Sequence, residues 1–505
     1  MSNPLYDQLF GKHGGQTTPF LVLEDGAVVT HADFLDVAAR FAHVLTRAEM
    51  SPGDRLAAQV EKSSWALALY AACVQSGIVF LPLNTAYTVD ELTYFIEDSG
   101  ARTLVCDASR KGALAAIGDL PGVRLETLNP DGSGSLADQA ESMPTDYPTI
   151  GREESDLAAL LYTSGTTGRS KGAMLTQGNL LSNTLILAES WRFDARDVLL
   201  HVLPIFHTHG LFVATNVTLV AGGSMIFLPR FDLDQVIARL PDATTLMGVP
   251  TLYTRLLDAP GFTADLTRDM RLFISGSAPL LAETHARFEK RTGHRILERY
   301  GMTETNMNTS NPYDGERRAG TVGFPLPGVE LRITDPATGE DVAAGNVGQI
   351  EVRGPNVFKG YWQMPEKTAA ELRPNGFFIT GDIGRVEEDG YVHIVGRNKD
   401  VIISGGYNIY PKEIELVLDE QPGVLESAVI GVPHADFGET VLGLIVPDPD
   451  VDPDLETIAG AAAASLARFK HPRKLLVVDE LPRNTMGKVQ KNLLREKYKS
   501  LFVPA

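Results

Sequence analysis

The chain has 505 residues, of which 44% are hydrophobic and 22% charged, and its formal net charge is -19 at pH 7. This length is too great for one hydrophobic core and predicts about three or four folding units. The acidic balance excludes a general nucleic-acid or anionic-membrane surface, because such surfaces need a positive field. An anionic small molecule remains a possible ligand, since a local basic pocket can form on an acidic protein.

Cysteine usage and the N-terminus indicate a cytoplasmic protein. The two cysteines, Cys73 and Cys106, are too few for a disulfide scaffold, and the first residues lack the basic-then-apolar pattern of a signal peptide. The most apolar stretch, residues 65–83, is interrupted by polar residues, Gly77 and Pro82. A buried helix followed by a strand explains this stretch better than a membrane span.

Helix and strand patterns alternate over about the first 320 residues. Residues 38–48 are amphipathic, Thr88 begins a helix with the residues of a capping box, and Thr176 is placed to cap the next helix. Short apolar runs predict strands at 55–60, 77–81, 102–106, 172–175, 198–203, 224–228, 245–248 and 272–275. This alternation predicts an α/β protein with doubly wound, mostly parallel sheets, which bind ligands at the carboxyl ends of their strands.

The pattern changes near residue 320, where glycine and proline become frequent. Strands are expected at 330–334, 348–353 and 391–395 without intervening helices, which predicts a small β-barrel or sandwich. Mixed α and β patterns return after residue 400, with helices expected at 411–419, 455–467 and 492–501. We therefore expect a domain boundary at 397–400, between a large N-terminal domain over 1–396 and a small α+β domain over 401–505.

Residues 163–172, Thr-Ser-Gly-Thr-Thr-Gly-Arg-Ser-Lys-Gly, are the most informative segment. They follow an apolar run at 157–162, so a strand is expected to lead into a loop that wraps a polyphosphate. Glycines let backbone N–H groups approach phosphate oxygens, the hydroxyls donate further hydrogen bonds, and Lys171 supplies a positive charge. The loop is not a Walker A motif, because Gly172 stands where that motif needs Ser or Thr. The alternative is an ordinary surface loop.

Four further segments suit a nucleotide. Residues 275–280 are small and leave room for a flat base, 300–305 combine an aromatic ring with a hydroxyl and a carboxylate, 380–382 end in a carboxylate that could bind ribose, and 484–488 present a lysine. Each segment alone is weak evidence, since turns and solvated side chains are common. Their joint presence with the phosphate loop favours a nucleotide site.

With these segments, and with Gly396-Arg-Asn-Lys-Asp400 and Gly405-Gly-Tyr-Asn-Ile-Tyr-Pro411, the chain resembles the adenylate-forming superfamily over nearly its whole length. That superfamily contains acyl- and aryl-CoA synthetases, peptide-synthetase adenylation domains and beetle luciferases. The resemblance implies two doubly wound subdomains, a β-barrel and a mobile C-terminal domain. It also implies an acid–thiol ligase that uses ATP and CoA as co-substrates and Mg²⁺ as cofactor, and that releases AMP and pyrophosphate.

The resemblance also implies roles for individual residues. Lys488 would bridge the acid and the α-phosphate, His207 would act beside it, and Glu304 with Thr163 would hold magnesium. Tyr300 would stack on adenine, while Asp382 and Arg397 would bind the ribose. The implied ATP and AMP site comprises Thr163, Ser164, Gly165, Thr166, Thr167, Gly168, Lys171, Gly276, Ser277, Ala278, Pro279, Glu298, Tyr300, Gly301, Met302, Thr303, Asp382, Arg397 and Lys488.

A second half-reaction needs another arrangement, because Lys488 occupies the side from which the thiol must attack. The resemblance implies that the C-terminal domain rotates about Lys399. Rotation would bring the pantetheine-binding residues into the site: Ser404, Gly405, Gly406 and Tyr407. We also hypothesise that a lysine acetyltransferase switches Lys488 off and a deacetylase restores it, because acylation removes the charge.

The acid is expected to be a small dicarboxylate. Arg299 could bind a second carboxylate bidentately, and His207 and His209 lie in what resembles the wall of the acyl site. An equally plausible role for Arg299 is an ion pair with Glu298 or Glu304. The segment 298–305 is most similar to that of malonyl-CoA synthetases, which implies malonate, with methylmalonate tolerated. Ligases for another small, medium-chain or aryl acid, a carrier-loading module and a non-catalytic nucleotide-binding protein are the alternatives.

Overall fold

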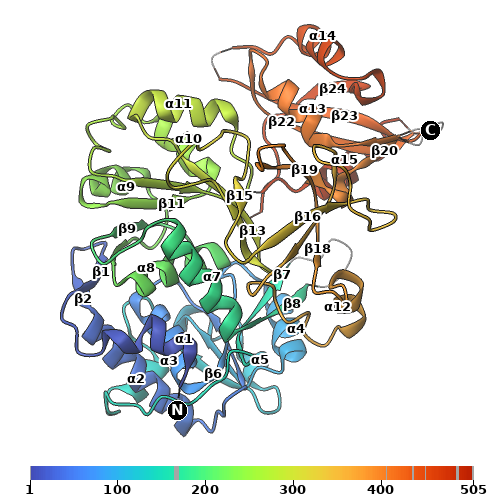
Figure 1. The fold of residues 1–505 in the computed structure, drawn as a ribbon. Helices are drawn as coiled ribbons and strands as arrows, with labels where there is room; N and C mark the ends of the chain where they lie inside the picture. The colour runs from blue at the N-terminus through green and yellow to red at the C-terminus, as the bar shows by residue number, and fades with distance from the viewer. Residues whose placement is uncertain are drawn as a thin grey trace.

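The computed structural model describes residues 2–163, 170–404, 407–434, 437–449, 451–484 and 488–502. These residues form four β-sheets with helices packed around them (Figure 1). Two large sheets belong to the N-terminal part of the chain, a smaller antiparallel sheet follows them, and the fourth sheet belongs to the C-terminal part. The predicted α/β class, with a large N-terminal and a smaller C-terminal unit, is confirmed.

The first large sheet has six strands in the order β6-β5-β3-β4-β7-β8. All neighbours are parallel except β8, which returns antiparallel to β7 on the far side of the phosphate loop. The carboxyl ends of the parallel strands therefore share one edge, and β7 ends there at Thr163. The strands are β3 (Arg55–Gln59), β4 (Val79–Pro82), β5 (Thr103–Cys106), β6 (Arg124–Thr127), β7 (Leu157–Thr163) and β8 (Lys171–Thr176).

The second large sheet has nine strands in the order β15-β14-β13-β12-β11-β9-β10-β1-β2. Its central strands from β13 to β1 are parallel, and antiparallel strands extend both edges. The strands are β1 (Pro19–Leu23), β2 (Val28–Thr30), β9 (Val198–His201), β10 (Ser224–Phe227), β11 (Thr245–Gly248), β12 (Leu272–Ser275), β13 (Leu297–Met302), β14 (Asn306–Ser310) and β15 (Phe324–Pro325).

Helices cover these sheets, and side-chain caps define where several of them begin. The Thr88 and Thr176 hydroxyls accept hydrogen bonds from the backbone N–H three residues later, and both caps are reciprocated, which confirms the predicted starts. The helices are α1 (Pro4–Leu9), α2 (His31–Arg47), α3 (Ser64–Ser76), α4 (Val89–Ser99), α5 (Ala115–Gly118), α6 (Ser135–Ala140), α7 (Gln177–Ser190), α8 (Asn216–Ala221), α9 (Leu233–Arg239), α10 (Pro250–Asp258) and α11 (Ala282–Thr292).

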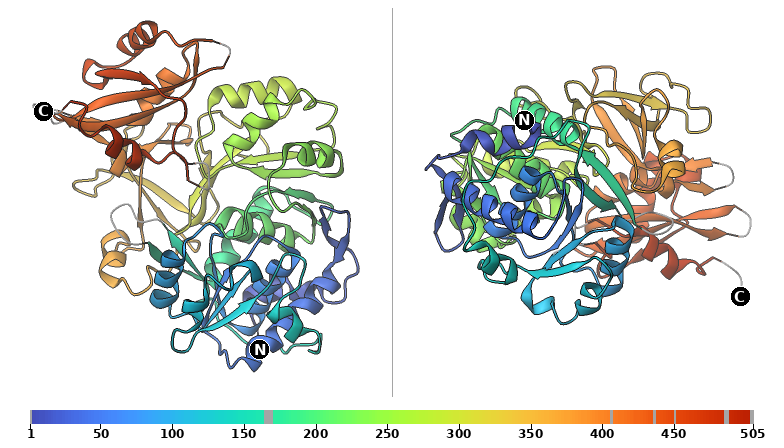
Figure 2. Two further views of the ribbon diagram at one scale, coloured as in Figure 1. Left: turned by 180° about the vertical axis from the view of Figure 1, so that it is seen from behind. Right: turned by 90° about the horizontal axis from the view of Figure 1, so that it is seen from below.

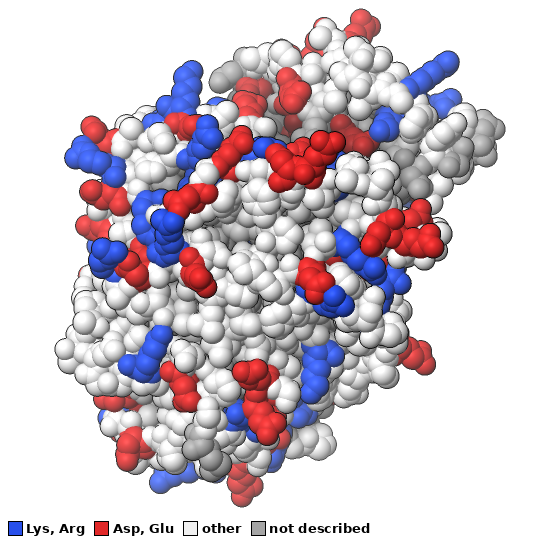
Figure 3. All heavy atoms as spheres, in the orientation of Figure 1, with Lys and Arg blue, Asp and Glu red and all other residues white. Residues whose placement is uncertain are grey.

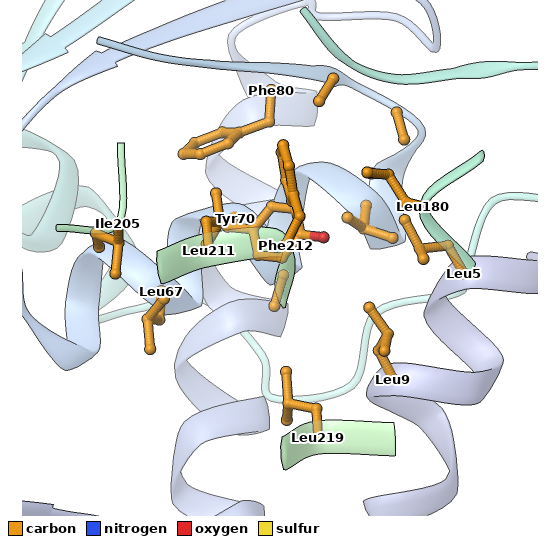
Figure 4. Packing of buried hydrophobic residues seen from close by; sticks show 14 of the residues in the cluster. Leu5, Leu9, Leu67, Tyr70, Phe80, Leu180, Ile205, Leu211, Phe212 and Leu219 are labelled. Carbon is orange, nitrogen blue, oxygen red and sulfur yellow. The ribbon is translucent and has the colours of Figure 1, made fainter. Parts of the chain in front are cut away.

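The main hydrophobic core lies where helices of the two large sheets meet (Figure 4). Leu5 of α1, Tyr70 of α3 and Phe212, which lies in a π-helix, are fully or almost fully buried in it. Helix α3 is buried around nearly its whole circumference, which explains the apolar stretch that contains it. Among the described residues, no helix combines the length and apolar character needed to span a bilayer.

The segment expected to form a small β-barrel contributes a four-stranded antiparallel sheet in the order β16-β17-β18-β19. Its strands are β16 (Glu330–Thr334), β17 (Gly348–Arg353), β18 (Phe378–Val386) and β19 (Val392–Arg397), and α12 (Pro365–Glu371) precedes β18. The register of β18 and β19 pairs Asp382 with Arg397, so the sheet itself places these two predicted ribose ligands side by side.

The C-terminal unit has strands in the order β21-β20-β23-β22, with β24 beside β23. In the left view of Figure 2 this unit, in orange and red, lies at the end of the molecule away from the N-terminus. Across the face shown in Figure 3, Lys and Arg alternate with Asp and Glu, so neither sign forms a continuous field there. The elements are β20 (Ile402–Ser404), β21 (Tyr407–Ile409), α13 (Pro411–Asp419), β22 (Val424–His434), β23 (Gly438–Pro447), α14 (Leu455–Ser465), β24 (Lys474–Val477) and α15 (Lys491–Tyr498).

Candidate active site

The predicted site residues gather at the carboxyl ends of the parallel strands of both large sheets. Thr163 ends β7, Gly276 follows β12, and Tyr300 lies near the end of β13. Sheets of this kind expose polar backbone groups at that edge, which is where α/β proteins bind ligands. Seven predicted site residues lie outside the described part of the chain: Ser164, Gly165, Thr166, Thr167, Gly168, Gly405 and Gly406.

Tyr300, Asp382 and Arg397 form one hydrogen-bonded group. The Tyr300 hydroxyl donates to Asp382 Oδ2 at 2.5 Å, and Arg397 Nε lies 3.1 Å from Asp382 Oδ1. The Thr380 hydroxyl accepts a hydrogen bond from the Asp382 backbone N–H at 3.1 Å, which fixes the backbone of β18 at this point. The Asp382 charge raises the pKa of Arg397, while burial and then Asp382 raise that of Tyr300. A carboxylate beside a guanidinium suits a vicinal diol.

Glu304 and Lys171 meet through two residues that the sequence did not single out, Tyr361 and Glu371. The Tyr361 hydroxyl lies 3.0 Å from Glu304 Oε1 and 2.7 Å from Glu371 Oε2. Lys171 Nζ lies 4.2 Å from the centre of the Tyr361 ring and 3.6 Å from Glu371 Oε1. Burial raises the pKa of Glu304, while the Tyr361 hydrogen bond and the Lys171 charge oppose the rise. The phosphate-loop lysine is thus held opposite the predicted magnesium ligand.

Arg299 is buried without an anionic partner. Its side chain is only 3% exposed, and neither Nε nor one terminal nitrogen, Nη2, has a hydrogen-bond partner among the described residues. Burial lowers the pKa of the guanidinium to about 9. The alternative role for Arg299 is wrong, because within the described ranges it makes no ion pair with Glu298 or Glu304. Adjacent residues of a strand point to opposite faces, which separates Glu298 from Arg299.

His207, His209, Ser277 and Arg299 form a polar cluster at the predicted acid site, which we call the acid pocket. His209 Nδ1 lies 3.2 Å from Ser277 Oγ, and the His209 backbone N–H donates to His207 Nδ1 at 3.3 Å. His209 Nε2 is buried and has no partner in the described structure. Burial, Arg299 and Lys488 lower the pKa of His207 to about 4, and burial followed by Arg299 lowers that of His209. Both rings are therefore neutral at neutral pH.

Residues 276–279 form the wall that Arg299 packs against. A Cβ atom at Gly276 would lie 2.4 Å from Arg299 Cζ, so only glycine leaves room for the guanidinium. The next residue, Ser277, has a positive φ of 71°, a conformation that costs a non-glycine residue of the order of 1 kcal/mol and is concentrated at functional sites. Ala278 is half-buried and Pro279 exposed at the rim.

Glu298 lies on the face of β13 opposite to Arg299. Burial raises the pKa of Glu298 to about 8, although the Leu280 N–H donates to one of its oxygens at 3.0 Å. Its second oxygen, Oε2, has no partner in the part of the chain that is described. Gly301 and Met302, the last two residues of β13, and Thr303, in the turn to β14, are half-buried.

The C-terminal unit brings Lys488 to this site. Its backbone N–H donates to Asn484 Oδ1 at 2.9 Å, and the Asn484 N–H donates to the Lys488 carbonyl, also at 2.9 Å, which closes the turn. Burial, followed by the Arg397 charge, lowers the pKa of Lys488 to about 8. Its charge also acts on His207, and the charges of Arg397 and Asp382 act on it, so Lys488 lies within electrostatic range of both the acid pocket and the ribose group.

The predicted hinge residue, Lys399, lies two residues after Arg397, and the predicted thiol residues belong to the C-terminal unit. Burial lowers the pKa of Lys399, which lies in a single 3₁₀ turn, and the neighbouring Asp400 accepts from Arg495 at 2.7 Å. Tyr407, opposite Ser404 in the β20–β21 pair, is 57% exposed and stacks on Phe469 at 4.6 Å. In this arrangement the Tyr407 ring faces solvent.

Comparisons with known proteins identify the family to which the chain belongs. The family model described as AMP-binding enzyme matches residues 12–362, and that described as AMP-binding enzyme C-terminal domain matches residues 413–488. A malonate–CoA ligase of Arabidopsis thaliana is 37% identical over 83% of this chain and 74% of its own length. A feruloyl-CoA synthase of an Amycolatopsis species is 36% identical over 94% of this chain and 95% of its own.

A solved relative also matches the arrangement of the two units. ATP-bound MatB from Rhodopseudomonas palustris is 57% identical, covers 99% of this chain and 100% of its own, and superposes with a TM-score of 0.97. The apo form of MatB has the same identity and coverage, but its TM-score is 0.87. The present arrangement, with Lys488 in the site, is therefore closer to that of the ATP-bound relative.

Proposed function

Because the chain belongs to the family of AMP-binding enzymes, we propose that it is an acid–thiol ligase that makes malonyl-CoA from malonate, CoA and ATP. The reaction passes through malonyl-AMP and releases AMP and pyrophosphate. The observation that carries the choice of acid is the buried Arg299, whose unpartnered nitrogens call for an anion beyond the carboxylate that reacts.

In the first half-reaction, the reacting carboxylate attacks the α-phosphorus of ATP. A free carboxylate is a poor acyl donor because oxide is a poor leaving group, whereas AMP leaves readily from the mixed anhydride. Both reactants are anions, so positive charge between them lowers the barrier most. Lys488 is the group that supplies this charge in our proposal, and its electrostatic influence on the acid pocket and the ribose group supports this role.

The remaining ATP contacts follow from the same geometry. Tyr300 stacks on adenine against the wall of residues 276–279, Asp382 and Arg397 bind the ribose hydroxyls, and the loop that ends at Lys171 holds the pyrophosphate. Glu304 and Thr163 fit Mg²⁺, because this ion takes one or two protein oxygens and fills its other positions with phosphate and water. When bound, Mg²⁺ neutralises charge on the departing pyrophosphate.

The second half-reaction requires Lys488 to leave the site. We infer a large domain over 1–396, a hinge at 397–400 and a small domain over 401–505 that rotates about Lys399. Rotation carries the segment from Ser404 to Tyr407 inward, where its glycines leave space for the pantetheine arm. The solvent exposure of Tyr407 in the present arrangement supports a role for this segment in the other state.

Arg299 selects the acid. Its planar fork binds the second carboxylate of malonate, while the neutral His207 and His209 leave the pocket without a further full charge. Methylmalonate is tolerated in this proposal.

The experiment is AMP formation measured with acetate, malonate, methylmalonate, succinate, octanoate and ferulate. Malonate must give the highest kcat/KM. A preference for ferulate or octanoate would favour the alternative ligases, and absence of AMP with every acid would favour a non-catalytic nucleotide-binding protein.

The efficiency of adenylation is expected to fall as pH rises above about 8. The pKa of Lys488 is about 8 in the free enzyme, and only its ammonium form stabilises the reacting anions. The fall should appear in kcat/KM, which reports the free enzyme. In kcat it should appear at higher pH, because bound anions raise the pKa of Lys488. Pyrophosphate release measured between about pH 6 and about pH 10 checks this, and a flat kcat/KM over that range contradicts it.

Acylation of Lys488 is expected to stop adenylation while leaving thioester formation intact. The amide carries no charge, so the first half-reaction loses its cation, whereas the second uses an arrangement without Lys488. Acid-dependent ATP–pyrophosphate exchange and CoA acylation by presynthesised malonyl-AMP measure the two steps separately. A lysine acetyltransferase and a deacetylase would be the regulatory partners. Full adenylation by a quantitatively acetylated sample rules the switch out.

We also propose a cytoplasmic location. Cys73 and Cys106 are both buried free thiols, which suits a reducing compartment. The co-substrates, ATP and CoA, are the partners that the function itself requires.

A further inference from the structure

A buried lysine and histidine join the two large sheets directly behind the acid pocket. Lys62, just after β3, is 7% exposed, and its Nζ lies 2.8 Å from His201 Nδ1 and 2.8 Å from the His201 carbonyl oxygen. His201 is the last residue of β9 and is buried. Lys62 Nζ also lies 4.3 Å from the centre of the Phe227 ring. Within the described ranges, Lys62 has no carboxylate partner within the 4.0 Å of an ion pair.

Burial of a lysine and a histidine costs free energy that burial of apolar residues would not. Burial lowers the pKa of Lys62 and that of His201, and the Lys62 charge lowers the latter further. Apolar residues of similar volume commonly replace buried ionic groups at no cost in stability, so a lysine without a carboxylate invites a functional explanation. The explanation must lie in the groups to which the lysine and the imidazole are hydrogen-bonded.

The hydrogen bonds of His201 run toward the acid pocket. An ammonium can only donate, so His201 Nδ1 accepts from Lys62 and the ring proton is assigned to Nε2. His201 Nε2 then donates to the Gly210 carbonyl at 2.9 Å, and the Thr215 hydroxyl donates to the same oxygen at 2.9 Å. Gly210 is the residue after His209. Lys62 therefore selects the imidazole tautomer that fixes this carbonyl.

Gly210, the second residue of the π-helix His209–Thr215, packs so tightly that the pocket residues have little freedom. A Cβ atom at Gly210 would lie 2.1 Å from the Pro204 carbonyl oxygen, so the two backbones are in close contact. The segment from Pro204 to Gly210 contains His207, and the π-helix begins within this segment, at His209. Single-turn π segments occur frequently at functional sites. A shift of the Gly210 peptide would move His209 away from Ser277.

We propose that Lys62 and His201 are positioning residues of the acid pocket: through the Gly210 carbonyl they hold His207 and His209 in the orientation that receives the acid. This role rests on the proposed function, because it assigns the acid to that pocket. Neither side chain touches the reacting atoms. Their contribution is the fixed geometry of this backbone segment, and a displacement of about 1 Å in such a segment can cost about a hundredfold in rate.

Two substitutions at His201 separate the halves of this hydrogen-bond chain. His201→Gln can place an amide nitrogen near the position of Nε2 and keep a donor for Gly210. His201→Asn places its amide near Nδ1, keeps a partner for Lys62 and loses the donor to Gly210. We expect His201→Asn to lower kcat/KM for the acid about tenfold to a hundredfold, mainly through KM, and His201→Gln to stay within about fivefold of wild type.

Lys62→Met provides an independent test, because it removes the charge and the donor but keeps most of the side-chain volume. It is expected to show the same rise in KM for the acid, with KM for ATP changed less than about threefold. His294→Asn is the matched control. His294 Nε2 also bonds a backbone carbonyl, that of Thr267 at 2.9 Å, but has no part in the proposed site. That variant should keep the KM for the acid.

The results separate this inference from the proposed function. KM is measured with the acid that wild type uses best, so a different acid preference would overturn the malonate assignment and leave the positioning test intact. The inference is overturned if His201→Asn and His201→Gln lower kcat/KM for the acid equally. It is also overturned if KM for ATP rises in parallel with KM for the acid. If one variant does not fold, the folded one among His201→Asn and Lys62→Met decides.

Discussion

Replacement of Lys488 by alanine is expected to reduce malonate-dependent adenylation by about a hundredfold to a thousandfold. The side chain supplies the positive charge that stabilises the two reacting anions. Acid-dependent ATP–pyrophosphate exchange measures this step alone. Thioester formation from presynthesised malonyl-AMP should stay within a few-fold of wild type, because that step proceeds after Lys488 has left.

The matched control is Lys474→Ala, which removes an exposed lysine from the same unit. It should leave both half-reactions unchanged. An unchanged exchange rate in Lys488→Ala would contradict the mechanism, and so would ADP as the nucleotide product. An equal loss in both half-reactions would instead show that Lys488 acts through the folding of its domain, and thermal unfolding of the variant would reveal that loss of structure.

Much of the fold was predictable because local signals and tertiary structure agree. Short apolar runs between turn residues mark strands reliably when both faces of a sheet are buried, and β11 and β12 begin and end where those runs do. Threonine caps fixed the starts of α4 and α7 for the same reason, since the cap is a contact within four residues. The π-helix at His209 was not predicted, because its hydrogen bonds depend on the packing around Gly210.

The candidate site was predictable only where its residues stand in compact segments. Arg299 directly precedes Tyr300, which predicted that it belongs to the site. The sequence could not decide between an ion pair and an unpaired guanidinium. That choice depends on the alternation of side chains along β13. Tyr361 and Glu371 could not be predicted as site residues, because they lie far along the chain from Glu304 and Lys171 and belong to no motif. The position of Lys62 beside His201 could not be predicted for the same reason.

Replacement of Arg299 by alanine is expected to remove most malonate turnover while preserving ATP binding. Truncation of one partner of a buried charge pair costs about 2 to 5 kcal/mol, which corresponds to about thirtyfold to several thousandfold in kcat/KM for malonate. KM for ATP should change less than about threefold, because the ribose group and Lys171 do not contact Arg299. Arg299→Lys keeps a charge but loses the planar fork, so it should recover only part of the activity.

A monocarboxylate provides the control for this variant. Acetate has no second carboxylate for Arg299, so its already low kcat/KM should be nearly the same in wild type and Arg299→Ala. Selectivity for malonate over acetate should therefore collapse by the same factor as kcat/KM for malonate. If malonate turnover persists with an unchanged KM, Arg299 does not bind the acid, and its unpartnered nitrogens require another ligand. If both acids lose activity equally, the variant has lost the shape of the wall at Gly276, against which the guanidinium packs.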